Sequence, residues 1–123
     1  STKLDFFCQE NNVDSIDLVK IDVEGAELEI LRSLNADFLS RVGQFTIEFH
    51  DFLDKTQLPA IREIIAKLEA HGFYAIKFSY YDFSDVLFLN TRIHKVDWMV
   101  VVRIVLVKYK AGLTRILKRM RKT

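Results

Sequence analysis

One stretch of the chain decides the fold: IDLVKIDVEGAELEILRSL, residues 16–34. Its first part, residues 16–23, is an apolar run rich in β-branched side chains, which is typical of a parallel strand covered on both faces. Beyond Glu24 and Gly25, apolar side chains recur at the spacing of one side of a helix, at Leu28, Ile30, Leu31 and Leu34. The stretch therefore predicts a buried strand that leads directly into a helix.

The following residues repeat the alternation of strand and helix. Residues 44–50 alternate apolar and polar side chains, which predicts a second strand with one apolar face. Pro59 suits a first helical position, and apolar residues at helical spacing follow it until Gly72. Residues 73–78 and 86–90 predict two strands that pair as an antiparallel hairpin. We therefore expect an α/β fold with a parallel sheet that ends in an antiparallel edge.

Length and composition are those of one globular domain. The chain has 123 residues, of which 50% are hydrophobic, and ten are Phe. Cys8 is the only cysteine, which excludes an internal disulfide framework and a cysteine-only metal cage, and we interpret it as a small, half-buried residue. The first residues show no secretory signal, so we expect a cytoplasmic protein. Because the chain opens at Ser1 without Met, we also expect it to belong to a longer protein.

Charge divides the chain into a body, residues 1–94, and a basic extension, residues 95–123. The body carries 9 Lys and Arg against 16 Asp and Glu, whereas the extension carries 9 against 1. The apolar run at residues 98–107 is too short to span a membrane, since ten helical residues reach only about 15 Å. The end of the extension predicts a basic amphipathic helix with an apolar stripe at Leu113, Ile116, Leu117 and Met120.

Two interpretations of the extension remain open. It is either a terminal helix docked on the body with its charges in solvent, or a helix that contacts an anionic membrane surface, so that the protein is membrane-peripheral. We expect no nucleic-acid partner, because the basic residues do not interleave with aromatic residues after Tyr109.

Candidate functional residues follow the two predicted parallel strands. Asp22 and Glu24 come at the end of the first strand, and Glu48 and His50 at the end of the second. Ligands of open α/β sheets bind beyond the carboxyl ends of such strands, so we expect these groups to share one rim. Asp22 or His50 then serves as a general base. The residue spacing does not demand a metal ion, and we predict no metal site.

Structural roles compete with these functional ones. Glu24 would simply favour the helix N-terminus, and Asp22 would cap it. Gly25 would allow tight packing between strand and helix instead of contact with a ligand. His50 would be a hydrogen-bonded structural residue at the end of its strand.

A resemblance to a known family lies in the same stretch. Residues 20–31, KIDVEGAELEIL, are very similar to the hallmark segment of FkbM-type methyltransferases. The family's Leu-Asp element precedes them at Leu4-Asp5, an acidic strand follows at residues 47–50, and the resemblance covers roughly residues 2–90. It implies the C-terminal half of a class I methyltransferase (Rossmann-like) sheet, from its fourth to its seventh strand. It also implies methyl transfer from S-adenosylmethionine to a hydroxyl oxygen of a small-molecule, glycan or lipid acceptor.

The resemblance also suggests site residues. Asp22 and Glu24 match the family's strand-four motif, which lies near methyl donor and acceptor, and Gly25 belongs to the same segment. We therefore expect Asp22, Glu24 and Gly25 to bind the cofactor, and Asp22, Glu24 and His50 to be catalytic. The family's glycine-rich cofactor loop has no counterpart, because none of the four Gly residues forms a Gly-x-Gly pattern. We therefore expect this chain alone to be inactive.

Two other functions stay open. The segment Asp22-Val23-Glu24-Gly25 also resembles the aspartate-nucleophile signature of haloacid-dehalogenase-like phosphotransferases, although that family has Asp in place of Glu24 and Thr in place of Ala26. The other alternative is a non-catalytic module that binds a membrane surface through residues 95–123.

Overall fold

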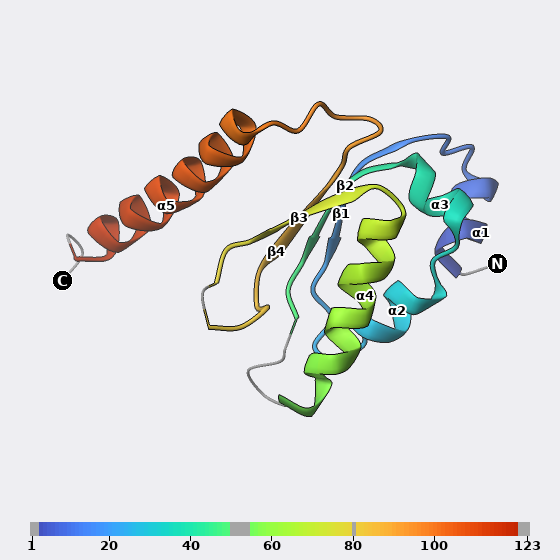
Figure 1. Ribbon diagram of the computed structural model, residues 1–123, viewed down its shortest axis with the longest axis horizontal. Coiled ribbons are helices and arrows are strands. Elements are labelled where there is room, and N and C mark those ends of the chain that lie inside the picture. The colour runs from blue at the N-terminus through green and yellow to red at the C-terminus, as the bar shows by residue number, and fades with distance from the viewer. Residues whose placement is uncertain (1–2, 50–54, 80, 121–123) are drawn as a thin grey trace.

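A four-stranded sheet with helices on both sides forms the fold (Figure 1). The computed structural model describes residues 3–49, 55–79 and 81–120, and in residues 3 and 115–120 only the backbone. The strands are β1 (Ile16–Ile21), β2 (Val42–Ile47), β3 (Phe73–Lys77) and β4 (Val86–Asn90), in the order β1-β2-β4-β3. The predicted α/β class is confirmed, and the sheet is consistent with a methyltransferase-like fold.

The pairing of the strands follows the prediction. Strand β1 is parallel to β2, with Val19 opposite Phe45 and Ile21 opposite Ile47. Strands β3 and β4 form the predicted antiparallel hairpin, and β4 inserts between β2 and β3, antiparallel to both. The second strand begins and ends earlier than predicted, so that Gly43 lies inside it.

Four helices and a short 3-10 turn lie on one side of the sheet, and one helix lies on the other (Figure 1). The first group comprises α1 (Lys3–Glu10), α2 (Glu27–Ser33), α3 (Ala36–Arg41), η1 (Lys55–Gln57) and α4 (Leu58–Ala70). Pro59 occupies the first turn of α4, as predicted. Helix α5 (Trp98–Met120) crosses the opposite face. Helices α1 and α3 were not predicted from the sequence pattern.

The core lies between the sheet and α1–α4. Phe45, Ile47 and Phe88 project from the sheet and are at most 1% exposed. They meet the buried side of α4, formed by Ile61, Ile64 and Leu68. Cys8 is also part of this cluster and is 2% exposed, so it is buried more deeply than the half-buried position predicted from the sequence.

Strand β1 differs from its prediction. It is not covered on both faces: Asp17, Leu18 and Lys20 are exposed, Leu18 to 51%, and only Ile21 is fully buried. The physical reason is its position, because β1 ends the sheet and no described helix lies over its second face. Its β-branched composition indicated the strand but not what covers it.

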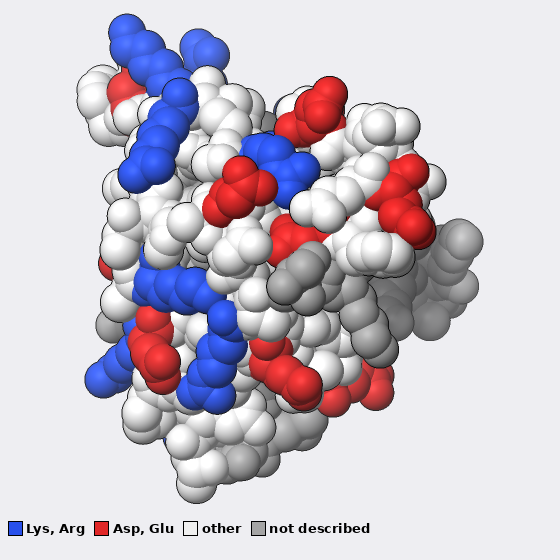
Figure 2. All heavy atoms as spheres, turned by 90° about the vertical axis from the view of Figure 1, so that its right-hand side faces the viewer, with Lys and Arg blue, Asp and Glu red and all other residues white. Residues whose placement is uncertain are grey.

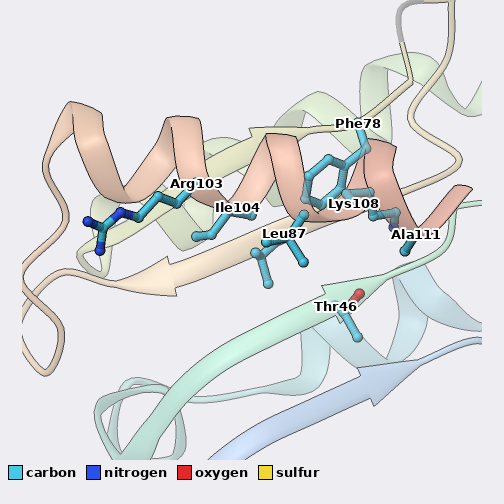
Figure 3. A pocket seen from close by; sticks show the side chains of 8 residues that line it. Thr46, Phe78, Leu87, Arg103, Ile104, Lys108 and Ala111 are labelled. Carbon is cyan, nitrogen blue, oxygen red and sulfur yellow. The ribbon is translucent and has the colours of Figure 1, made fainter. Parts of the chain in front are cut away.

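The second face of the sheet is only half covered. Thr46 and Leu87 sit directly opposite each other on β2 and β4, and α5 lies over them with Ile104 (Figure 3). A cavity of about 450 Å³ remains between α5 and the strands. Because directly paired residues share a face, Leu18 and Lys20 of β1 continue this surface beyond the reach of α5.

Helix α5 has no apolar stretch sufficient to cross a bilayer, and the same holds for the other helices among the described residues. The boundary between residues 94 and 95 stays a prediction. So does the amphipathic pattern at the end of the chain, because its side chains lie outside those described.

Candidate functional site

The candidate site lies where β1 and β2 end. Both strands run in the same direction, and beyond the last pair the Glu48 amide donates to the Ile21 carbonyl oxygen at 3.0 Å. The two carboxyl ends therefore meet at one edge, as predicted from the sequence. This is the edge at which open α/β sheets bind ligands.

The loop after β1 has an unusual backbone. Glu24 has φ +48° and Gly25 has φ +108°, so two successive residues lie in the left-handed region. For Glu24 this conformation costs about 1–3 kcal/mol, and such residues cluster at functional sites when their surroundings hold them in place. The helix α2 begins two residues later, at Glu27.

The Glu27 side chain stabilises this loop through two hydrogen bonds. Its side chain is 2% exposed, and its two carboxylate oxygens accept hydrogen bonds from the amides of Val23 at 3.3 Å and Gly25 at 2.9 Å. A buried carboxylate that accepts backbone amides fixes their direction, and each charge-assisted bond is stronger than a neutral one. Sequence reasoning missed this role, since a Glu in the first turn of a helix is normally solvated there.

Asp22 lies on the open face of the sheet. Its carboxylate accepts from the Lys20 ammonium at 3.0 Å, and the two side chains are 37% and 63% exposed. The pKa of Lys20 is raised, first by this hydrogen bond and by the charge of Asp22, and further by Glu48 and Asp85 against the opposing effect of desolvation. Because ion pairs between exposed side chains contribute little to stability, a ligand can displace Lys20 at little cost.

The structural roles considered for Asp22 and Gly25 are wrong, whereas that of Glu24 stays a prediction. Helix α2 has Ala26 as its N-cap without any side-chain bond, so Asp22 does not cap it. Glu24 lies before the first turn, whose acidic residues are Glu27 and Glu29. A Cβ on Gly25 would meet no atom within 4 Å, so close packing does not require glycine there; the positive φ does.

The hairpin end of β3 and β4 contributes further charges to the same rim. Asp85 forms an ion pair with Lys108 of α5, whose ammonium also lies 4.4 Å from the centre of the Phe78 ring. The pKa of Asp82 is lowered, first by the hydrogen bond from the Ser79 side chain and then by those from Ser84. Sequence reasoning singled out neither Asp82 nor Asp85.

His50 lies outside the described residues, as does Asp51, so its predicted approach to Asp22 stays a prediction. Of the other histidines, His71 ends α4, where its Nδ1 lies 2.8 Å from the Lys67 carbonyl oxygen. Within the described ranges no three His, Cys, Asp or Glu residues come together as a possible metal site.

The exposed side chains of the candidate site are acceptors of hydrogen bonds and protons. The loop carries two exposed carboxylates, those of Asp22 and Glu24. The space next to the Gly25 backbone is empty, since a Cβ there would meet no atom within 4 Å. Carboxylates accept hydrogen bonds from hydroxyl and ammonium groups, and they remove protons when suitably placed. The rim therefore suits a ligand that carries hydroxyl groups and positive charge.

Comparison with known proteins gives independent information. Residues 1–74 match the family described as the methyltransferase FkbM domain. The chain is 34% identical over 87 residues, 71% of its length, to the 31-O-demethyl-FK506 methyltransferase FkbM of Streptomyces tacrolimicus. It is 35% identical over 71 residues, 58% of its length, to the AMB antimetabolite synthetase AmbE of Pseudomonas aeruginosa. The matches span 30% and 3% of these relatives. No solved structure matched.

Proposed function

This chain belongs to the FkbM methyltransferase domain family, and we propose that the protein carrying it transfers a methyl group from S-adenosylmethionine to a hydroxyl oxygen. The acceptor is a small molecule, a glycan or a lipid. The observation that carries the proposal is the position of the family's segment: it forms the open, acidic loop at the carboxyl edge of two adjacent parallel strands.

The exposed groups of the loop fit the cofactor. S-adenosylmethionine supplies, when bound, a methyl group activated by a positively charged sulfur. Asp22 and Glu24 offer carboxylate acceptors for its hydroxyl or ammonium groups, and Gly25 leaves the backbone uncovered for close approach. Glu27 supports this fit, since it keeps the loop in its open conformation.

Proton removal is the second task of the rim. Methyl transfer to a hydroxyl would require a base of this chain to take up the hydroxyl proton. Asp22 is the described residue suited to this role, because its carboxylate is exposed and is paired only with an exposed lysine. His50 is the alternative base. Either residue would take up this proton and help to orient the acceptor oxygen toward the cofactor site.

We propose that residues 1–123 alone do not complete the reaction. The chain spans 30% of the methyltransferase relative, and β1 has an unpaired edge within the described part of the sheet. Both observations support a cofactor site that needs further residues.

The test uses the protein at its natural length. Calorimetric binding of S-adenosylmethionine and formation of S-adenosylhomocysteine are measured for the wild type, Asp22→Asn, His50→Gln and Glu24→Gln. Loss of a general base lowers kcat by about 100-fold or more. We therefore expect this loss in either Asp22→Asn or His50→Gln. Glu24→Gln should weaken cofactor binding.

Glu29→Gln is the matched control, because Glu29 is exposed on α2 and makes none of these contacts. It should leave binding and turnover unchanged. Failure of the natural protein to bind S-adenosylmethionine would refute the proposal. Full activity of Asp22→Asn would remove Asp22 from proton transfer.

A further inference from the structure

Helix α5 has an inner side that packs on the sheet. Ile104 faces Leu87 across the cavity, and Lys108 reaches Asp85 and the Phe78 ring (Figure 3). These contacts hold the helix against strands β3 and β4. They leave much of the rest of the helix surface exposed.

One side of this exposed surface is apolar. We call it the outward stripe; it comprises Trp98, Met99, Val102, Leu106, Tyr109 and Leu113, of which Trp98 and Val102 also line a pocket with Tyr74 of β3. Steps of three and four residues lead from Met99 to Leu113, and Trp98 lies four residues before Val102, so these side chains share one side of the helix. Their exposed fractions run from 44% to 74%, and Trp98 is the most exposed. A contiguous exposed stripe of this kind marks an interaction surface, unlike single exposed apolar residues.

Basic residues border the outward stripe. Lys110 lies four residues after Leu106, Arg103 lies four residues after Met99, and both are exposed. Residues 95–123 together carry nine Lys and Arg against one Asp. An apolar stripe flanked by positive charge complements a surface with negative headgroups above an apolar interior.

The geometry of α5 fits a helix that lies in the membrane interface. Its 23 residues would be about 34 Å long, but the Arg103 and Lys108 side chains interrupt the apolar run, and α5 does not qualify as a membrane-spanning helix. Trp98 and Tyr109 are the residue types that favour the boundary between water and lipid. Such a helix lies parallel to the membrane with its apolar side buried.

We propose that α5 binds the surface of an anionic phospholipid bilayer. The outward stripe inserts among the acyl chains near the headgroups, and the basic residues of the extension contact the lipid phosphates. The inner side keeps its contacts with β3 and β4, so the candidate site is held beside the membrane. This inference does not depend on the proposed methyl transfer.

Vesicle sedimentation tests the proposal with the natural-length protein. Vesicles contain phosphatidylcholine with phosphatidylglycerol, or phosphatidylcholine alone. We expect binding to the anionic vesicles that weakens as salt is added, and at least about tenfold weaker binding to the neutral ones. Substitution of Leu106→Gln together with Leu113→Gln should reduce binding to anionic vesicles by at least about tenfold.

The matched control is the double variant Phe6→Gln and Ile93→Gln, since these residues are 56% and 51% exposed, close to Leu106 and Leu113, and lie outside the stripe. It should bind like the wild type. The proposal is overturned if the wild type does not sediment with anionic vesicles, or if both double variants bind equally. It is also overturned if ultracentrifugation without lipid shows a dimer that only the Leu106→Gln and Leu113→Gln variant dissociates, because the stripe then joins two copies.

Discussion

The two faces of the sheet differ in how deeply their side chains are buried and in the surface that covers them. On the face covered by α1–α4, Phe45 and Phe88 are fully buried, and the helices pack directly on them. On the other face Leu18 and Tyr74 stay 51% and 47% exposed, although α5 crosses part of it. The comparison shows that the described fold gains most of its apolar burial on one face, while the other stays partly exposed.

Surface charge follows the same division. On the side of α1–α4, Lys and Arg alternate with Asp and Glu, and neither sign forms a broad patch in that view (Figure 2). On the other side α5 presents its outward stripe with a basic border. A surface of mixed charge favours solubility, whereas an apolar and basic one favours a partner.

The largest expected effect is on the packed face. Phe45→Ala removes a ring that is 0% exposed and lies 5.3 Å from the Phe73 ring, so it should lower the free energy of unfolding by about 3–5 kcal/mol. Tyr74→Ala, on the open face, should cost about 1 kcal/mol or less. Urea denaturation measures both. Equal losses would show that the two faces contribute alike.

A smaller effect is expected where the packed face meets the site. Glu27→Gln replaces one of the two oxygens that accept the Val23 and Gly25 amides, which should cost about 1–3 kcal/mol and loosen the loop. Hydrogen exchange of the Gly25 amide should then accelerate. Glu29→Gln, exposed on the same helix, should change stability by less than about 0.5 kcal/mol. Unchanged exchange in Glu27→Gln would contradict the role assigned to this carboxylate.

The smallest effect is electrostatic and lies on the open face. The folded-state pKa of Lys20 is raised above the ordinary 10.5, mainly by Asp22, so the stabilisation is present below pH 10.5 and is lost as the pH rises through the raised value. Asp22→Asn should return the pKa of Lys20 toward 10.5. An NMR titration of the Lys20 side chain measures this shift, and an unaltered pKa would exclude the ion pair.

The sequence predicted the elements that periodicity marks strongly. The β-branched run of β1, the alternation in β2 and the helical spacing after Pro59 all gave the correct element. Helix α3 escaped because it is only six residues long, and its main local signal is the Asn35 side chain that accepts from the Phe38 amide. The exposure of β1 could not be predicted, because it depends on which elements cover the strand.

The position of the candidate site was predictable from the sequence, but the hydrogen bonds of Glu27 that stabilise its loop were not. The order of strands placed Asp22, Glu24 and Gly25 at the edge where β1 ends, since parallel strands end together. The burial of Glu27 could not be inferred from the sequence. Its carboxylate accepts backbone amides of a loop whose left-handed conformation at Glu24 and Gly25 is known only from the structure.

Among the described residues one edge of β1 is unpaired, and this edge affects how the molecule behaves in concentrated solution. A terminal strand offers a row of backbone donors and acceptors that another chain can extend into a larger sheet. Asp17 and Lys20 are exposed on either side of Leu18, and charges at such positions act as gatekeepers against fibril growth. These two surface charges therefore oppose association along the strand edge that the described residues leave unpaired.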